Sequence, residues 1–142
     1  MDTFQIQGLT FCYPGQTVCA LERTSLTVRQ GDFLVLCGPS GGGKTTLLRN
    51  LKPTLTPHGR REGQVLFEGL PLDSLSLRDA SAKIGFVMQD PDNQLVTDKV
   101  WHELAFGLES LGYDTPIIRR RVAEMASFFG IEDWFYRDVA AL

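Results

Sequence analysis

The sequence has no long apolar run and no excess of positive charge. No apolar stretch approaches ~18 residues, so no transmembrane helix is expected. Residues 1–10 lack the charged start and apolar core of a signal peptide. Fourteen Lys and Arg against 17 Asp and Glu give a formal net charge of −3. This balance argues against broad non-specific binding to nucleic acid or anionic lipid. The composition, 43% hydrophobic and 22% charged, is that of a globular protein.

Cysteine and histidine are scarce and show no metal-binding pattern. Cys12, Cys19 and Cys37 are odd in number and have neither CxxC spacing nor a partner-histidine pattern. Because all three lie in stretches predicted as strands, we expect small buried side chains in a reducing, cytosolic compartment. His58 and His102 have no ligand partner at metal spacing, which favours a structural or solvated role.

The most specific pattern is a glycine-rich loop. Residues 38–45 fit G-x-x-x-x-G-K-[ST], the phosphate-binding loop of nucleotide hydrolases. The apolar run 33–37 before it predicts a buried strand, and a helix is expected from Lys44 onward. Backbone N–H groups and the helix N-terminus would hold a phosphate chain. Lys44 would reach the β- and γ-phosphates, and the Thr45 hydroxyl would bind Mg²⁺.

The first part of the chain predicts an α/β body. Alternation of apolar and polar residues over 4–11 and 21–28 predicts two half-buried antiparallel strands. Residues 64–67 and 84–88 predict further strands, with a turn at 68–69. Residues 72–82 predict a short helical or irregular segment.

The second part predicts helices. Residues 97–111 and 115–129 carry apolar residues at helical spacing. Thr97 and Thr115 are the expected N-caps, and Gly112 and Gly130 the expected helix ends. Residues 1–90 are therefore predicted to form a β subdomain with the loop-bearing core, and residues 91–142 a helical subdomain.

Several motifs together resemble the ATP-binding-cassette (ABC) transporter ATPases. They are the opening 9–15 with Tyr13, the loop 38–46, and the segment 84–91 that contains Gln89. Residues 90–94 and 105–107 most resemble the ATPase subunits of energy-coupling factor (ECF) importers. The resemblance implies a P-loop NTPase (RecA-like) core with an antiparallel β subdomain and a helical subdomain. Residues 1–142 would be the truncated N-terminal part of one ABC ATPase domain.

The resemblance also implies residue roles. Tyr13 would stack on adenine, because a flat π-face is sequence-tolerant. Gln89 would contact Mg²⁺ or its water, so Thr45 and Gln89 are the implied metal-binding residues. Lys44 and Gln89 are the implied catalytic residues. The implied ATP-binding residues are Tyr13, Gly38, Ser40, Gly41, Gly42, Gly43, Lys44, Thr45 and Thr46.

The implied function is ATP binding, with Mg²⁺, in a subunit that powers import of a vitamin or metal ion. The implied partners are a second ABC ATPase subunit and an integral membrane transporter subunit, at the cytoplasmic face of the cell membrane. The family's catalytic carboxylates, signature motif and switch histidine are missing, and residues 139–142 resemble the approach to that signature. We therefore expect an N-terminal piece that binds nucleotide without hydrolysing it.

Two alternatives stay open from the residues. In a complete small P-loop GTPase or kinase, Asp90 would bind Mg²⁺, although no Asn-Lys-x-Asp guanine motif is present. A regulator could instead bind ATP without hydrolysing it. Outside the motifs, the charge run 119–121 predicts a solvated helix face. We expect three aromatic side chains either to pack within the helical subdomain or to line a docking groove for the membrane partner: Trp101, Trp134 and Phe135.

Overall fold

The computed structural model describes residues 1–142, which form two compact units, Met1–Ile84 and Gly85–Leu142. None of its helices combines the length and apolar character that crossing a membrane requires.

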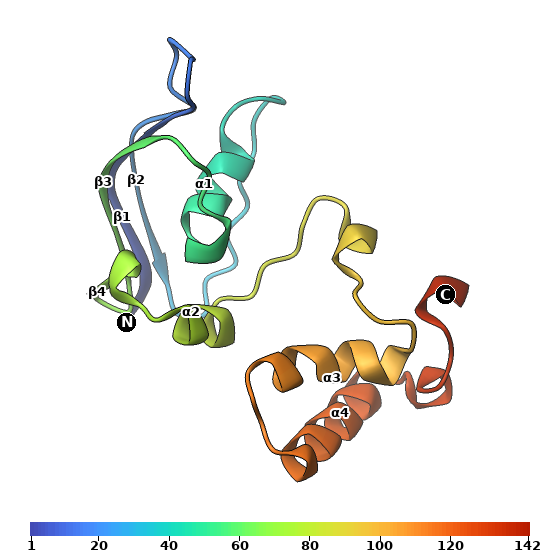
Figure 1. Cartoon of the computed structure of the whole chain (residues 1–142). Helices are drawn as coiled ribbons and strands as arrows, with labels where there is room; N and C mark the ends of the chain where they lie inside the picture. The colour runs from blue at the N-terminus through green and yellow to red at the C-terminus, as the bar shows by residue number, and fades with distance from the viewer. The chain divides into compact units, whose positions relative to one another are not determined.

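An antiparallel sheet forms the base of the first unit. Its strand order is β2-β1-β3-β4, with each neighbouring pair antiparallel (Figure 1). The predicted strands 4–11, 21–28 and 64–67 are confirmed, as is the turn at 68–69, where Glu68 and Gly69 have positive φ. The bounds are β1 Asp2–Cys12, β2 Leu21–Arg29, β3 Arg60–Phe67 and β4 Leu70–Pro71.

The helices of the first unit cover one face of this sheet (Figure 1). Side chains from β1, β2 and β3 meet Leu47 of α1 in a single core, where Leu9 and Phe11 are fully buried. Burial of each large side chain contributes about 1.5–3 kcal/mol. The bounds are α1 Lys44–Asn50, η1 Pro53–Leu55, η2 Leu72–Ser74 and α2 Leu77–Lys83.

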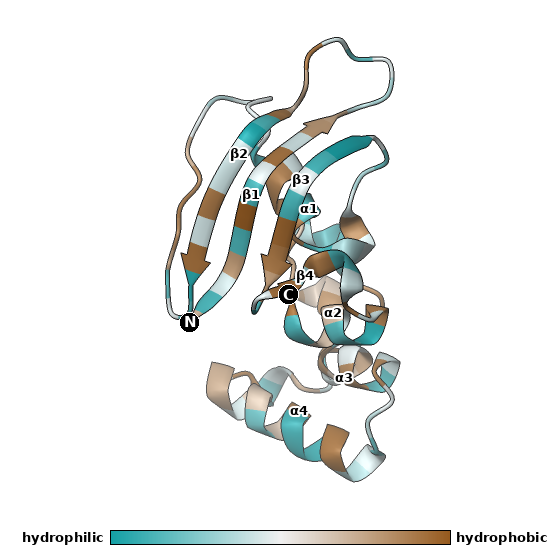
Figure 2. Cartoon of the chain, turned by 90° about the vertical axis from the view of Figure 1, so that its left-hand side faces the viewer, coloured by the Kyte–Doolittle hydropathy of each residue, from teal (hydrophilic) through white to brown (hydrophobic).

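Two predicted strands are absent. The apolar segment 33–37 makes no ladder with any strand and runs past the β2 edge of the sheet (Figure 2). Its Phe33 is 95% exposed, so the prediction of a buried strand is wrong. Residues 84–88 are likewise not a strand. Strand preference alone does not make a strand, because its N–H and C=O groups need a neighbour, and none of the four strands pairs with either segment.

The second unit is helical, as predicted. Helix α4 begins one residue after its N-cap Asp114, so Thr115 is the first helical residue and not the cap. Gly130, with φ 65°, ends that helix as expected. Helix α3 begins at Val100 rather than at residue 97. The bounds are η3 Pro91–Gln94, α3 Val100–Ser110, α4 Thr115–Phe129, η4 Glu132–Trp134 and η5 Val139–Ala141.

The late start of α3 has a local cause. The Glu103 carboxylate accepts hydrogen bonds from the backbone N–H groups of Val96 (3.1 Å) and Thr97 (2.8 Å), and from the Thr97 hydroxyl (2.8 Å). These bonds keep the chain ahead of the helix extended. Lys99 takes the N-cap position instead, so the predicted Thr97 cap is wrong.

Candidate nucleotide-binding site

The glycine loop adopts a backbone that other residues rarely adopt. Gly38, Gly41 and Gly43 have φ values of 150°, 79° and 79°. A Cβ on Gly43 would overlap the carbonyl oxygen of Ala20, which precedes β2. Two conditions at position 43 therefore require glycine: the left-handed φ and the close approach of the loop to the β1–β2 hairpin.

Lys44 closes the loop. Its Nζ donates hydrogen bonds to the carbonyl oxygens of Gly38 (2.8 Å) and Pro39 (2.7 Å), while the backbone N–H of Gly42 donates to Pro39 (3.2 Å). An ammonium group is thus held directly over the loop. Thr45, in the first turn of α1, is exposed. A cation, glycine N–H groups and a free hydroxyl are the donor set that a phosphate chain with Mg²⁺ requires.

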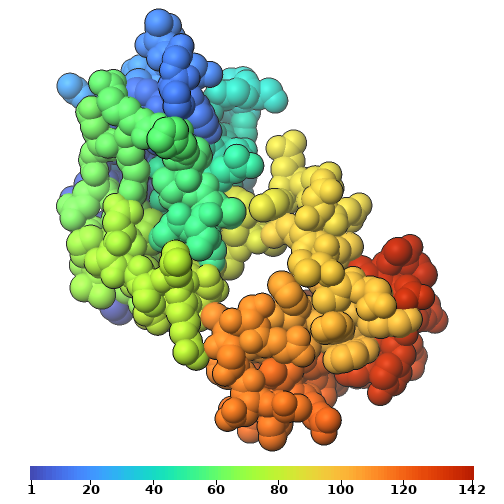
Figure 3. All heavy atoms as spheres, viewed as in Figure 1, coloured from blue at the N-terminus to red at the C-terminus, as the bar shows by residue number.

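Tyr13 is joined to the same helix. Its hydroxyl lies 3.1 Å from Oγ1 of Thr46, a buried residue of α1. Its ring packs edge-on against Phe11, with centroids 5.0 Å apart. The structure therefore brings together Tyr13 and the loop helix, which are 33 positions apart in the sequence. Figures 1 and 3 show the turn after β1 and the glycine loop at the same end of the first unit.

A cavity of about 500 Å³ lies beside Tyr13 and was not predicted. It is open to solvent and is formed by the β1–β2 turn together with the chain that leads into β3. The sequence indicates a turn after β1 and another before β3 from their Pro and Gly residues, but it does not show that the two turns lie next to each other. The lining residues are Cys12, Tyr13, Pro14, Gln16, Thr17, Cys19, His58, Gly59 and Arg60.

The cysteines correct a second prediction. Cys12 and Cys19 form a disulfide, and Cys37 is exposed, so the expectation of three small buried thiols is wrong. The cause is the hairpin register. Phe11 pairs with Leu21, and the Ala20 N–H donates to the Phe11 carbonyl at 2.8 Å. The residues that follow Phe11 and precede Ala20, Cys12 and Cys19, are therefore placed side by side, with Cα atoms 4.1 Å apart.

Gln89 belongs to the second unit, where it is exposed and follows the extended segment 85–88. Gln94 holds this segment in place. Its Oε1 accepts from the Met88 N–H at 2.6 Å, and its Nε2 donates to the Phe86 carbonyl at 3.2 Å. The role of Gln89 toward Mg²⁺ stays a prediction.

The remaining candidates of the second unit are also placed. Arg119, Arg120 and Arg121 are all exposed, as predicted for a solvated face. Trp101 and Phe135 line a cavity of about 510 Å³ between α3 and α4. His102 lies 3.6 Å from Glu109, and no group of three His, Cys, Asp or Glu side chains is arranged to hold a metal ion.

A glycine loop that ends in Lys-Thr at the start of a helix is the site of a P-loop nucleotide-binding protein. Within that class, the chain belongs to the ABC transporter family, whose model matches residues 21–141. This membership sets aside the alternative of a small P-loop GTPase or kinase that uses Asp90.

Three similar proteins show the extent of the match. A sequence of Bacillus thuringiensis subsp. konkukian, assigned as an ABC transporter ATP-binding protein, is 42% identical over 97% of this chain and 25% of its own length. The energy-coupling factor transporter ATP-binding protein EcfA of Syntrophomonas wolfei is 36% identical over 91% of this chain and 46% of its own. The structure of cbiO1 from Clostridium perfringens, part of the ABC transporter complex cbiONQ, superposes with a TM-score of 0.83 at 29% identity. It covers 99% of this chain and 55% of cbiO1, so the chain spans between a quarter and about half of these proteins.

Proposed function

We propose that this chain binds ATP with Mg²⁺ through the glycine loop and Tyr13. The single observation that carries the proposal is Lys44, whose ammonium is held over a loop of positive-φ glycines at the start of α1. Gly38 and Ser40 to Thr46 would hold the phosphates, and Tyr13 would stack on the adenine. The Thr45 hydroxyl would bind Mg²⁺, and Gln89 would contact Mg²⁺ or its water. Bound Mg²⁺ supplies charge neutralisation on the phosphates, and the chain supplies donors and position.

We further propose that the longer protein is an ABC transporter ATPase that hydrolyses ATP to drive import. Similarity to EcfA and to cbiO1 supports this class of importer. A vitamin or a metal ion is the proposed cargo. The proposed partners are a second ATPase subunit and a membrane transporter subunit that holds the protein at the cytoplasmic face of the membrane. Gln89 and the residues after it would couple ATP to that partner.

The test is titration calorimetry of ATP in the presence of Mg²⁺ with the wild-type chain and with Lys44→Ala. We expect Lys44→Ala to lose at least about tenfold in affinity, because hydrogen bonds to charged groups contribute about 1.5–3 kcal/mol each. The matched control is Arg49→Ala, an exposed cation on the same helix, which should bind as the wild type does. Equal affinity of Lys44→Ala and wild type would refute the site.

A further inference from the structure

The turn that carries Tyr13 is closed by a covalent bond. The Cys12–Cys19 disulfide joins the end of β1 to the residue before Ala20, and Tyr13 lies inside the closed turn. Both cysteines line the cavity beside Tyr13. Any change at this bond therefore acts on the residue proposed to hold the adenine.

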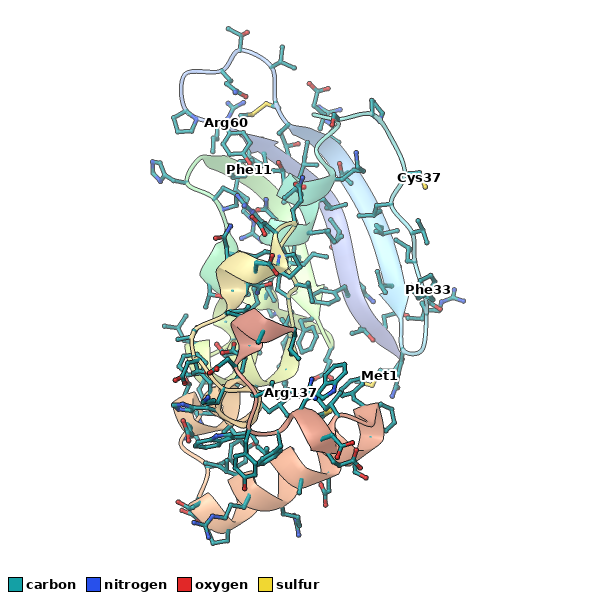
Figure 4. All side chains as sticks on the ribbon, turned by 90° about the vertical axis from the view of Figure 1, so that its right-hand side faces the viewer. Met1, Phe11, Phe33, Cys37, Arg60 and Arg137 are labelled. Carbon is teal, nitrogen blue, oxygen red and sulfur yellow. A yellow bond between two sulfur atoms is a disulfide. The ribbon has the colours of Figure 1, made fainter.

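The two sulfurs differ in exposure and in charge environment. Cys12 is 7% exposed, whereas Cys19 is partly exposed. The Arg60 guanidinium lies beside Cys12, with Nη2 at 3.5 Å from Sγ. Figure 4 shows Arg60 next to the disulfide, at the same end of the unit as Phe11. A guanidinium stabilises a thiolate, and a thiol that is more acidic is a better leaving group in thiol–disulfide exchange.

We propose that Cys12–Cys19 is a thiol–disulfide exchange site that sets the nucleotide affinity of the chain. A low-molecular-weight thiol, as its thiolate, attacks Sγ of the accessible Cys19. The Cys12–Cys19 bond breaks, and Cys12 leaves as a thiolate beside Arg60. A second molecule of the same thiol then attacks the mixed disulfide on Cys19 and releases a free symmetric disulfide. Two external thiols are oxidised, the protein takes up two electrons, and each cysteine ends with a proton from solvent.

The structure gives the expected consequence for binding. With the disulfide intact, the turn is fixed at both ends and the Tyr13 hydroxyl reaches Thr46. With the bond reduced, residues 13–19 gain freedom that nucleotide binding must remove again. Ordering one side chain and a short loop corresponds to about a two- to tenfold loss of affinity. This consequence rests on the proposed nucleotide site, whereas the exchange chemistry does not.

The first experiment tests the chemistry alone, in a Cys37→Ser background that removes the exposed third thiol. Reduction by glutathione is followed by alkylation and mass spectrometry of the 12–19 peptide. We expect Arg60→Ala to slow reduction by about threefold or more, since the leaving thiolate loses its counter-charge. The control Arg29→Ala, an exposed arginine at the end of β2, should react as the background does. Equal rates for Arg60→Ala and Arg29→Ala would overturn the proposed exchange site.

The direction of attack has its own test. In the same background, brief reaction with glutathione followed by acid quenching and peptide mapping should find the mixed disulfide on Cys19 and the released thiol on Cys12, because Cys12 is buried and Cys19 is partly exposed. Glutathione found on Cys12 would overturn the assignment of the attacked sulfur.

The second experiment measures ATP affinity of the Cys37→Ser chain before and after reduction by dithiothreitol. We expect the oxidised form to bind more tightly, and Cys12→Ser and Cys19→Ser to match the reduced form and ignore the reductant. Binding that Lys44→Ala abolishes but that reduction leaves unchanged would overturn the redox proposal and keep the nucleotide site. If neither form binds ATP, the proposed nucleotide site is refuted, and the claim that the disulfide sets nucleotide affinity is refuted with it.

Discussion

A buried lysine holds the end of a helix in the first unit. Lys52 is 9% exposed, and its ammonium donates to the carbonyl oxygens of Ala80 (2.9 Å) and Ile84. Both carbonyls lie at the C-terminal end of α2. The Ala80 carbonyl also accepts from the Ile84 N–H at 3.2 Å, whereas the Ile84 carbonyl, at the C-cap, lies beyond the reach of intrahelical donors. Burial lowers the pKa of Lys52 from its ordinary value. The positive charge also lies at the negative end of the helix dipole, so charge and hydrogen bonds act in the same place.

Replacement of Lys52 by methionine tests this role. The change keeps the apolar stem and removes the donors. The Ile84 carbonyl is then left without a partner, while the Ala80 carbonyl keeps its bond from the Ile84 N–H. We expect a loss of about 1–3 kcal/mol in the free energy of unfolding, the cost of unsatisfied buried polar groups. Urea unfolding followed by far-ultraviolet circular dichroism gives this value.

A lysine at the end of α2 itself provides the control. Lys83 pairs with Glu68 at 3.0 Å, but its side chain is 50% exposed. Lys83→Met should change the free energy of unfolding by less than about 1 kcal/mol, because exposed ion pairs contribute little. Similar losses for the two variants would show that Lys52 acts only as one more surface charge.

At the scale of the element, Glu103 organises the start of α3. Burial raises the pKa of its carboxyl group, but hydrogen bonds from Thr97 and Val96 outweigh burial, and the net pKa lies below the ordinary value of 4.5. A carboxyl group whose folded pKa is lowered stabilises the fold above its unfolded pKa. That stabilisation is lost as the pH falls through the folded value.

Glu103→Gln should therefore destabilise the second unit by about 1 kcal/mol at neutral pH, as the loss of a helix-capping group does. The difference from wild type should shrink as the pH falls below 4.5 and vanish once the carboxyl group is protonated. Both tryptophans, Trp101 and Trp134, lie in this unit, so tryptophan fluorescence reports on its unfolding. The exposed Glu124→Gln on α4 is the control, and a pH-independent gap would contradict the assignment.

The elements that the sequence predicts well are those specified by local pattern. Alternation is enough for β1 and β2, and helical spacing is enough for α3 and α4, because each pattern is completed within a few residues. The loop 38–45 is equally local, so its position at the start of α1 follows from its motif. The segment 33–37 fails for the opposite reason: its apolar character is correct for a strand, but pairing depends on another segment.

The parts of the site that sequence reasoning missed all depend on contacts between turns. The disulfide requires the register that pairs Phe11 with Leu21, and a count of cysteines does not contain that register. The cavity beside Tyr13 requires Arg60 and the β1–β2 turn to lie side by side. Tyr13 itself could be named because its family motif is local, whereas its contact with Thr46 could not.

On the scale of the whole molecule, the most consequential surface is the apolar segment 33–37. Phe33 is 95% exposed and Val35 66% exposed, and the backbone between them is unpaired. The segment has no charge and no proline, which is the profile of a strand that pairs with another chain. None of the four strands of its own unit pairs with it in the structure.

We therefore expect the chain to self-associate at micromolar concentration, since unpaired strand edges associate in this range. The double substitution Phe33→Lys with Val35→Lys should shift it toward monomer, because charges on an open edge oppose pairing. Phe128→Lys is the matched control: Phe128 is 80% exposed, but it lies on α4, whose backbone groups are already paired. Sedimentation velocity at several concentrations separates the cases. A wild-type chain that stays monomeric at every concentration would show that the segment finds a partner within its own chain in solution. An equal shift toward monomer with Phe128→Lys would assign the association to exposed apolar surface in general rather than to an open strand edge.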